Sequence, residues 1–345
     1  VNSVTASFLL NSKLKSDISS SFSNTLTFHT YPNYYTYDTT TLNIIKFKMK
    51  NITKNSIFAG ECMIEVSGNT DDLDKKQIKM NLNFGGDTFN AAVYFSRLTK
   101  KQFNTFYFTG LGQDHLSEMM VKRFKNENLK TDLIQIIKDK YPGLYSIQTD
   151  KKGNRSFSYW RNDSAAKKMI EKCNLDEIDK FISNSELFYY TGISLGILKQ
   201  KDQNKLIDLS KKSKLTAFDF NYRNSFHGNK IKSQSLFKKS NLSSNINFIS
   251  FDDIIEIFGK SDPIEFINTF KRKDNIIILK HFEKIFYSEF NKIGSINIPI
   301  IKAIDTTAAG DSFNGSFLAY HLKKENLSIE DKISMSHKIT KNVLK

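Results

Sequence analysis

Short apolar runs that alternate with longer helical patterns place the strongest constraint on the fold of this chain. The runs lie at residues 56–60, 104–109, 187–191, 215–223, 247–253 and 275–280. Helical patterns lie between several of them, as at residues 201–212. Strands that alternate with helices are typical of parallel sheets covered by helices. The pattern therefore predicts an α/β fold with a central, mostly parallel sheet flanked by helices.

One segment interrupts this alternation. Residues 133–161 carry three short β patterns, at 133–137, 143–149 and 155–160, with a turn-like Lys-Lys-Gly-Asn before the last one. Two β patterns joined by such a turn predict a hairpin. We expect these strands, at about 133–161, to form a small β-sheet lid that covers a site.

The chain is basic, with a formal net charge of +15. A basic chain raises nucleic acid as a partner. Its lysines, however, are scattered in pairs, such as Lys151-Lys152 and Lys211-Lys212, and no block of five or six basic residues occurs. The charge pattern predicts a solvated basic surface that attracts anionic small molecules, and no nucleic-acid partner.

The composition of the N-terminal segment suggests where the folded domain begins. Residues 1–48 are rich in Ser, Thr, Asn and Tyr without any period, and Met49 stands just before the first apolar run. We expect 1–48 to be a disordered or untranslated upstream extension, and 49–345 to be the folded domain, truncated at its C-terminal end.

Cys62 and Cys173 have no disulfide or metal spacing. No apolar run has the length of a membrane span. These features predict a cytoplasmic protein without a membrane partner.

The strongest candidate for a functional site is the stretch D-T-T-A-A-G-D-S-F at 305–313, which opens a helical pattern. Small residues at Ala308, Ala309 and Gly310 let a ligand approach the backbone. Amides at a helix N-terminus lack partners within the helix and favour anions. Asp311 stands in the same turn, where a carboxylate is stabilised by roughly 0.3–1 kcal/mol, so we expect its pKa to stay low. Anion donors beside an ionised base suit phosphoryl transfer to a hydroxyl.

Two glycines and an asparagine form a second candidate group. Gly85 and Gly86 precede a helical pattern and permit close approach of a polyol to the backbone. Asn90, one turn into that helix, can exchange hydrogen bonds with hydroxyl groups. Asn221 and Arg223 form a third group at the polar tip of a strand, where ligands bind in open parallel sheets.

The lid carries a further set of polar side chains. Tyr145 and Tyr159 bring hydroxyls on rigid arms, and Arg161 brings a planar fork for a carboxylate. A sugar acid presents both kinds of partner.

Five motifs in order carry a resemblance to a known family. They are G-E-C-M-I-E (60–65), G-G-D-T-x-N (85–90), P-G-L-Y (142–145), Y-W-R-N (159–162) and D-T-T-A-A-G-D-S-F (305–313). Together they resemble the ribokinase-like carbohydrate kinases over almost all of residues 56–345, and most closely the branch that acts on 2-keto-3-deoxygluconate. The resemblance implies a ribokinase-like fold with a lid. It also implies ATP-dependent phosphorylation of the terminal hydroxyl of the sugar acid to 2-keto-3-deoxy-6-phosphogluconate, as in Entner-Doudoroff metabolism.

The resemblance also implies roles for single residues. Asp311 would be the catalytic base, with the amides of Ala308, Ala309 and Gly310 as an anion hole. Substrate contacts would come from Gly85, Gly86, Asn90, Tyr145, Tyr159, Arg161, Arg223 and Asp311. Nucleotide contacts would come from Asn221, Arg223, Lys280, Ala309, Gly310 and Asn314. Arg161 would hold the substrate carboxylate, and Asp253 would act indirectly on Mg²⁺. A monovalent cation and pairing into a homo-oligomer through the lid are further family traits.

Two features depart from the family pattern. Relatives carry a glycine-bearing turn beside the nucleotide, where this chain reads Lys280-His281-Phe282-Glu283-Lys284. Relatives also run on for about a dozen residues past the point that matches Lys345. Two alternatives to the sugar-acid kinase stay open: a kinase for a neutral sugar such as fructose or ribose, and a catalytically lapsed sugar-binding homologue.

Overall fold

The computed structural model describes residues 53–69, 79–100, 102–149, 155–259, 262–299, 308–323 and 326–343. Several expectations fall outside these residues: the extension at 1–48, the start at Met49, the lid turn at 151–154, the first three residues of the long motif and the end at Lys345.

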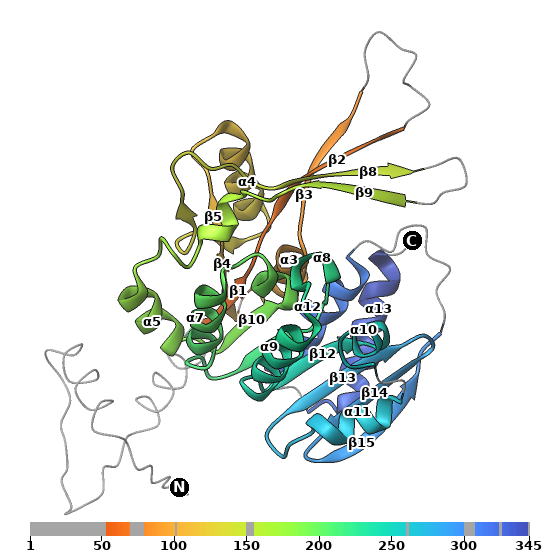
Figure 1. Ribbon diagram of the computed structural model, residues 1–345. Helices are drawn as coiled ribbons and strands as arrows, with labels where there is room; N and C mark the ends of the chain where they lie inside the picture. Colours follow the sequence, from red (N-terminus) through yellow and green to blue (C-terminus); the bar gives the residue numbers. More distant parts are fainter. Residues whose placement is uncertain are drawn as a thin grey trace, which may run out of the picture. The chain divides into compact units, whose positions relative to one another are not determined.

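A nine-stranded sheet forms the centre of the fold (Figure 1). Its strands, in spatial order, are β15 (Lys292–Asn297), β14 (Lys284–Glu289), β13 (Ile276–His281), β12 (Ile246–Ser250), β11 (Thr216–Asp219), β10 (Leu187–Thr191), β1 (Lys54–Ala59), β4 (Phe103–Phe108) and β6 (Leu129–Lys130). All neighbours from β6 to β13 pair in parallel, whereas β14 and β15 pair antiparallel. The expected α/β fold and its six strands are confirmed.

Helices cover both faces of this sheet because its parallel strands are apolar on both sides. In β1, Ile57 packs into one buried cluster and its neighbour Phe58 into the other. The first cluster includes residues of α5 (Leu175–Ser183), α7 (Gln200–Ser210), α9 (Lys230–Leu242), α10 (Phe251–Phe258) and α11 (Pro263–Phe270). The second includes residues of α3 (Asp87–Thr99), α4 (His115–Asn126), α12 (Ala309–Leu322) and α13 (Ile329–Val343). Among the described residues, no helix is long and apolar enough to cross a membrane.

A separate four-stranded sheet forms the lid, in the order β3-β2-β8-β9 (Figure 1). Its strands are β2 (Met63–Asn69), β3 (Asn81–Gly85), β8 (Leu144–Thr149) and β9 (Arg155–Trp160). The hairpin expected within 133–161 is present as β8 and β9. The boundaries were otherwise wrong, because β2 and β3 supply half of the sheet and β2 pairs with β8 in parallel. The run at 133–137 lies outside the lid, where β7 (Gln135–Ile136) pairs with β5 (Gly110–Leu111).

Three short helical elements complete the described fold. They are η2 (Ala165–Lys168), α6 (Gly192–Gly196) and α8 (Asn224–His227). The helix α8 begins directly after the polar tip of β11, so that Arg223 occupies its N-cap position. This places Arg223 at the carboxyl end of the sheet, where the sequence pattern predicted it.

Candidate active site

The N-terminus of α12 meets the carboxyl end of the parallel sheet. Ala308 precedes the helix with φ 61° and ψ 7°, a left-handed conformation that a residue with a Cβ rarely adopts. No described side chain caps this end, in contrast to α4, where Asp114 accepts a hydrogen bond from the amide of Ser117. Among the described side chains, none competes with an anion for the amides that open α12. Backbone strain of this kind is concentrated at functional sites.

Asp311 lies in the first turn of α12 and is half-buried. Its Oδ2 accepts a hydrogen bond of 2.9 Å from Nδ2 of Asn90 on α3. Burial, followed by the nearby carboxylate of Asp87, raises the pKa of Asp311 to about 7, although Asn90 and Lys280 act in the opposite direction. The expectation of a low pKa was wrong, because burial and two neighbouring carboxylates outweigh the helix dipole.

Two more aspartates, both missed as site residues from the sequence, line this end of the sheet. Oδ2 of Asp87 accepts hydrogen bonds from Oγ1 of Thr191 at 2.7 Å and from Nδ2 of Asn221 at 2.9 Å. Asp219 ends β11, and burial raises its pKa to about 6. The available signal was their position: Asp87 lies within the G-G-D-T-x-N motif, and Asp219 stands at a strand end.

Asn314 connects these acids to Lys280. Its Nδ2 donates to Oδ2 of Asp219 at 2.8 Å, and its Oδ1 accepts a hydrogen bond of 3.3 Å from Nζ of Lys280. A Cβ built on Gly310 would lie 3.6 Å from that Nζ atom. The ammonium of Lys280 therefore sits beside the N-terminus of α12. An anion held there would meet both backbone amides and a positive side chain.

The two glycines before α3 have a packing role in this structure. A Cβ on Gly86 would lie 2.2 Å from the carbonyl oxygen of Glu61, and one on Gly85 would lie 2.5 Å from the hydroxyl of Tyr145. Side chains at these positions would clash with the start of the lid. Both Cβ positions therefore point at other atoms of the protein and leave no space there for a ligand.

Tyr145 and Arg161 of the lid are held by glutamates that the sequence reasoning missed. The hydroxyl of Tyr145 donates to Oε2 of Glu65, and burial together with that contact raises the pKa of Tyr145. Nη2 of Arg161 donates to Oε2 of Glu61 in a buried ion pair. Tyr159, in contrast, is 54% exposed. The sequence feature that could have indicated these contacts is the pair of glutamates four residues apart in G-E-C-M-I-E.

Arg161 also touches the main body of the fold. Its guanidinium carbon lies 4.7 Å from the ring centroid of Phe226 on α8, a cation–π distance. Nε of Arg161 and Oε1 of Glu61 are both buried without a hydrogen-bond partner among the described residues. Buried polar atoms of this kind need a partner to offset their desolvation. Two such atoms therefore remain available to a polar ligand or to water.

Asp253 has a structural role. Its Oδ1 accepts the amide of Tyr222 at 3.0 Å, and its Oδ2 accepts the amide of Ser250 at 3.2 Å as part of a capping box on α10. The described residues contain no group of three or more His, Cys, Asp or Glu side chains with metal-site geometry. An indirect role of Asp253 on Mg²⁺ stays a prediction.

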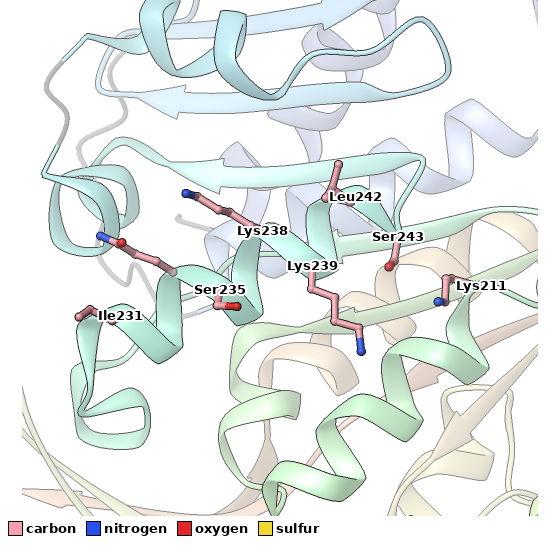
Figure 2. A pocket seen from close by; sticks show the side chains of 8 residues that line it. Lys211, Ile231, Ser235, Lys238, Lys239, Leu242 and Ser243 are labelled. Carbon is pink, nitrogen blue, oxygen red and sulfur yellow. The ribbon is translucent and has the colours of Figure 1, made fainter.

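A surface pocket of about 570 Å³ lies apart from these residues, along α9 (Figure 2). It is lined by Lys211, Ile231, Gln234, Ser235, Lys238, Lys239, Leu242 and Ser243. None of the predicted substrate or nucleotide contacts is among them. The pocket faces the solvent and leaves the assignment of the site at α12 unchanged.

Comparison with known proteins gives consistent matches. The model of the pfkB family of carbohydrate kinases matches residues 53–340. A 2-dehydro-3-deoxygluconokinase of Dickeya dadantii (strain 3937) is 34% identical over 284 residues, which cover 78% of this chain and 88% of the relative. The Escherichia coli (strain K12) protein of the same name is 32% identical over 305 residues, covering 85% and 96%. The crystal structure of a Thermotoga maritima 2-dehydro-3-deoxygluconokinase has a TM-score of 0.71 at 17% identity, covering 85% and 93%.

Proposed function

This chain belongs to the pfkB family of carbohydrate kinases, and on that basis we propose that it phosphorylates 2-keto-3-deoxygluconate (2-dehydro-3-deoxygluconate). The product is 2-keto-3-deoxy-6-phosphogluconate, and ATP is the phosphoryl donor. Relatives of this name that are about one-third identical support the substrate. In this proposal the kinase domain comprises residues 49–345, and the family model matches residues 53–340.

One observation carries the proposal: Asp311 combines a position at an open helix N-terminus with a pKa of about 7. A base is most effective when its pKa lies near the working pH. In the reaction, Asp311 takes the proton of the terminal hydroxyl as the hydroxyl oxygen bonds to the γ-phosphorus. The bond between that phosphorus and the β,γ-bridging oxygen breaks, and ADP leaves.

The transferring phosphoryl group carries negative charge that the chain must hold. The amides of Ala308, Ala309 and Gly310 provide donors, and Lys280 adds a positive charge next to Gly310. Asn221, Arg223 and Asn314 would contact the nucleotide from the carboxyl end of the sheet. A Mg²⁺ ion that arrives with ATP would neutralise its phosphates.

The sugar acid would bind on the other side of Asp311, between α3 and the lid. Asn90 would contact a hydroxyl next to the base. Tyr145 and Tyr159 would contact the sugar from above, and Arg161 would hold the carboxylate through the N–H groups that Glu61 leaves free. A closed lid excludes water, which limits hydrolysis of ATP.

A second candidate, a neutral-sugar kinase, is favoured by one observation. Arg161 already forms a buried ion pair with Glu61, so its positive charge is neutralised before any substrate carboxylate arrives. A site of this kind gains less from an acidic substrate than one with an unpaired arginine.

Release of ADP across a panel of sugars separates the candidates. The panel holds 2-keto-3-deoxygluconate, gluconate, fructose and ribose, each at the same concentration with Mg-ATP. We expect the keto-acid to have the highest kcat/KM. A preference for fructose or ribose would favour the second candidate, and binding of the keto-acid without ADP release would indicate a lapsed homologue.

Exposed apolar side chains on one face of the lid support a homo-oligomer. Leu82 on β3 is 47% exposed and Trp160 on β9 is 62% exposed, and both lie on the face of the lid sheet opposite to Tyr145 and Tyr159. Exposed apolar side chains on one face are a candidate interaction surface. The protein would work in a reducing, cytoplasmic compartment, in keeping with the unpaired thiols of Cys62 and Cys173.

A further inference from the structure

Two phenylalanines project from successive hairpin turns of the large sheet. Phe282 lies between β13 and β14 with φ 41°, and it is 82% exposed. Phe290 lies between β14 and β15 with φ 49°, and it is 75% exposed. A left-handed backbone conformation favours glycine. A ring that stays exposed contributes little hydrophobic stabilisation to the fold. The two residues therefore share the same unfavourable combination.

They differ in the end of the sheet at which they lie. β13 runs parallel to β12 and β11, so its last residue, His281, lies at the carboxyl end with Asp219 and Ser250. β14 runs antiparallel to β13 and brings Phe290 to the opposite end. Only Phe282 thus shares an end with the candidate active site, which makes Phe290 a matched control.

The ring of Phe282 is supported by two others. Its centroid lies 4.7 Å from that of His281, and the His281 ring lies 4.0 Å from Phe251 at the start of α10. Phe251 and His281 are half-buried. Phe282 is therefore the exposed outer member of a packed three-ring cluster.

The cluster lies next to the predicted phosphate site. Lys280 immediately precedes it, and Nζ of Lys280 contacts Asn314 and lies close to Gly310. In the proposed function, the sugar binds on the other side of Asp311, next to Asn90, which contacts the Asp311 carboxylate. A nucleotide whose terminal phosphate sits at α12 must extend away from the sugar. In the strand order, that direction leads toward β12 and β13.

We propose that Phe282, supported by His281 and Phe251, stacks on the base of the nucleotide. The inference rests on the proposed kinase function and adds a nucleotide contact from a residue outside the predicted site residues. Stacking on an aromatic ring tolerates different bases because each has a π-face. The site would therefore accept nucleotides with different bases.

Tryptophan fluorescence tests the contact without requiring turnover. The chain has a single tryptophan, Trp160, so W160F/F282W and W160F/F290W each carry one reporter. We expect ATP and adenosine to quench the F282W reporter in a saturable manner, and tripolyphosphate to leave it unchanged. The F290W reporter should respond to none of the three. An F282W emission that ATP leaves unchanged at saturating concentration would overturn the proposal.

Steady-state kinetics provides the second readout. F282A should raise KM for ATP about tenfold, with KM for the sugar and kcat within twofold of the parent, and F282Y should restore KM. F290A should leave KM for ATP unchanged. Equal effects of F282A and F290A would contradict the proposal. If nucleotides quench F282W but no sugar is phosphorylated, the kinase function fails while the base site stands.

Discussion

Asn90 and Asp311, 221 positions apart in the chain, are joined by a hydrogen bond of 2.9 Å from the Asn90 amide to the Asp311 carboxylate. The bond is possible because α12 crosses α3 closely. A Cβ on Gly315 would lie 2.2 Å from the carbonyl oxygen of Ala91, so only glycine fits at this crossing. The helix proposed to contact the sugar, α3, and the helix proposed to hold the phosphate, α12, thereby meet at the proposed base.

The pH dependence of the reaction follows from the pKa of Asp311. Because that pKa is raised to about 7, the fraction of ionised base changes across the neutral range. We expect kcat/KM to rise about tenfold per pH unit below pH 7 and to level off above it. Initial rates from pH 5.5 to 8.5, with sugar and ATP each varied, give the profile. A flat profile over this range would argue against Asp311 as the base.

Replacement of Asn90 should move that profile. Its hydrogen bond lowers the pKa of Asp311, so N90A should shift the midpoint of kcat/KM to higher pH by up to about one unit. Asn83, an exposed asparagine on β3, provides the control, and N83A should keep the parent midpoint. A lower rate alone would only indicate weaker sugar binding. The test is the midpoint, and an unchanged midpoint in N90A would be inconsistent with the proposed contact.

The same carboxylate should cost stability at alkaline pH. Its pKa is raised from the ordinary aspartate value to about 7 in the folded chain, so the folded state binds more protons than the unfolded state between these values. Stability therefore falls as pH rises from about 4 to 7. D311N removes this penalty and should raise Tm at pH 8 by a few degrees, with little effect at pH 4. Thermal melts of both proteins at the two pH values decide the point, and a lower Tm for D311N at pH 8 would contradict the sign.

A test of Arg161 must replace both partners of its buried ion pair with Glu61. Removal of one partner leaves an uncompensated buried charge, which costs about 3–5 kcal/mol. The double variant E61Q/R161M removes both charges at similar volume and should fold. We expect its KM for the keto-acid to rise about 10–100-fold, with KM for ATP unchanged.

A control for this variant uses another ion pair of the chain. Arg97 and Glu127 form an ion pair at 2.9 Å that joins α3 to the residue after α4. R97M/E127Q should leave KM for the keto-acid within twofold of the parent. If E61Q/R161M also kept the parent KM, Arg161 would not be the residue that recognises the carboxylate.

The sequence predicted the elements that local pattern determines. Six of the parallel strands lie at the predicted apolar runs, and the motif at 305–313 carries the start of α12 and Asp311. The hairpin strands β14 and β15 were not predicted, because their half-buried residues lack a continuous apolar run. The prediction of the lid lacked β2 and β3. Local pattern could not indicate them, because β2 pairs with β8 across about 80 residues, as at Ile64 and Leu144.

The electrostatics of the site could not be predicted from the motifs. Asp87, Asp219 and Asp311 come from three distant segments, and their mutual repulsion depends on the packing of α3 and α12 against the sheet. Local reasoning accounted for the helix N-terminus near Asp311 but omitted these neighbours. The glutamates that hold Tyr145 and Arg161 escaped notice for the same reason, since each contact spans 80 residues or more.

Single-turnover phosphoryl transfer by D311N tests the central claim most directly. The variant keeps the shape of the side chain and loses the base. We expect the rate of ADP formation with saturating Mg-ATP and 2-keto-3-deoxygluconate to fall about 10²–10⁴-fold, with nucleotide binding retained. The control is D176N, which alters an exposed aspartate in the first turn of α5 and should keep the parent rate. A D311N rate close to that of the parent would contradict the assignment of Asp311 as the catalytic base.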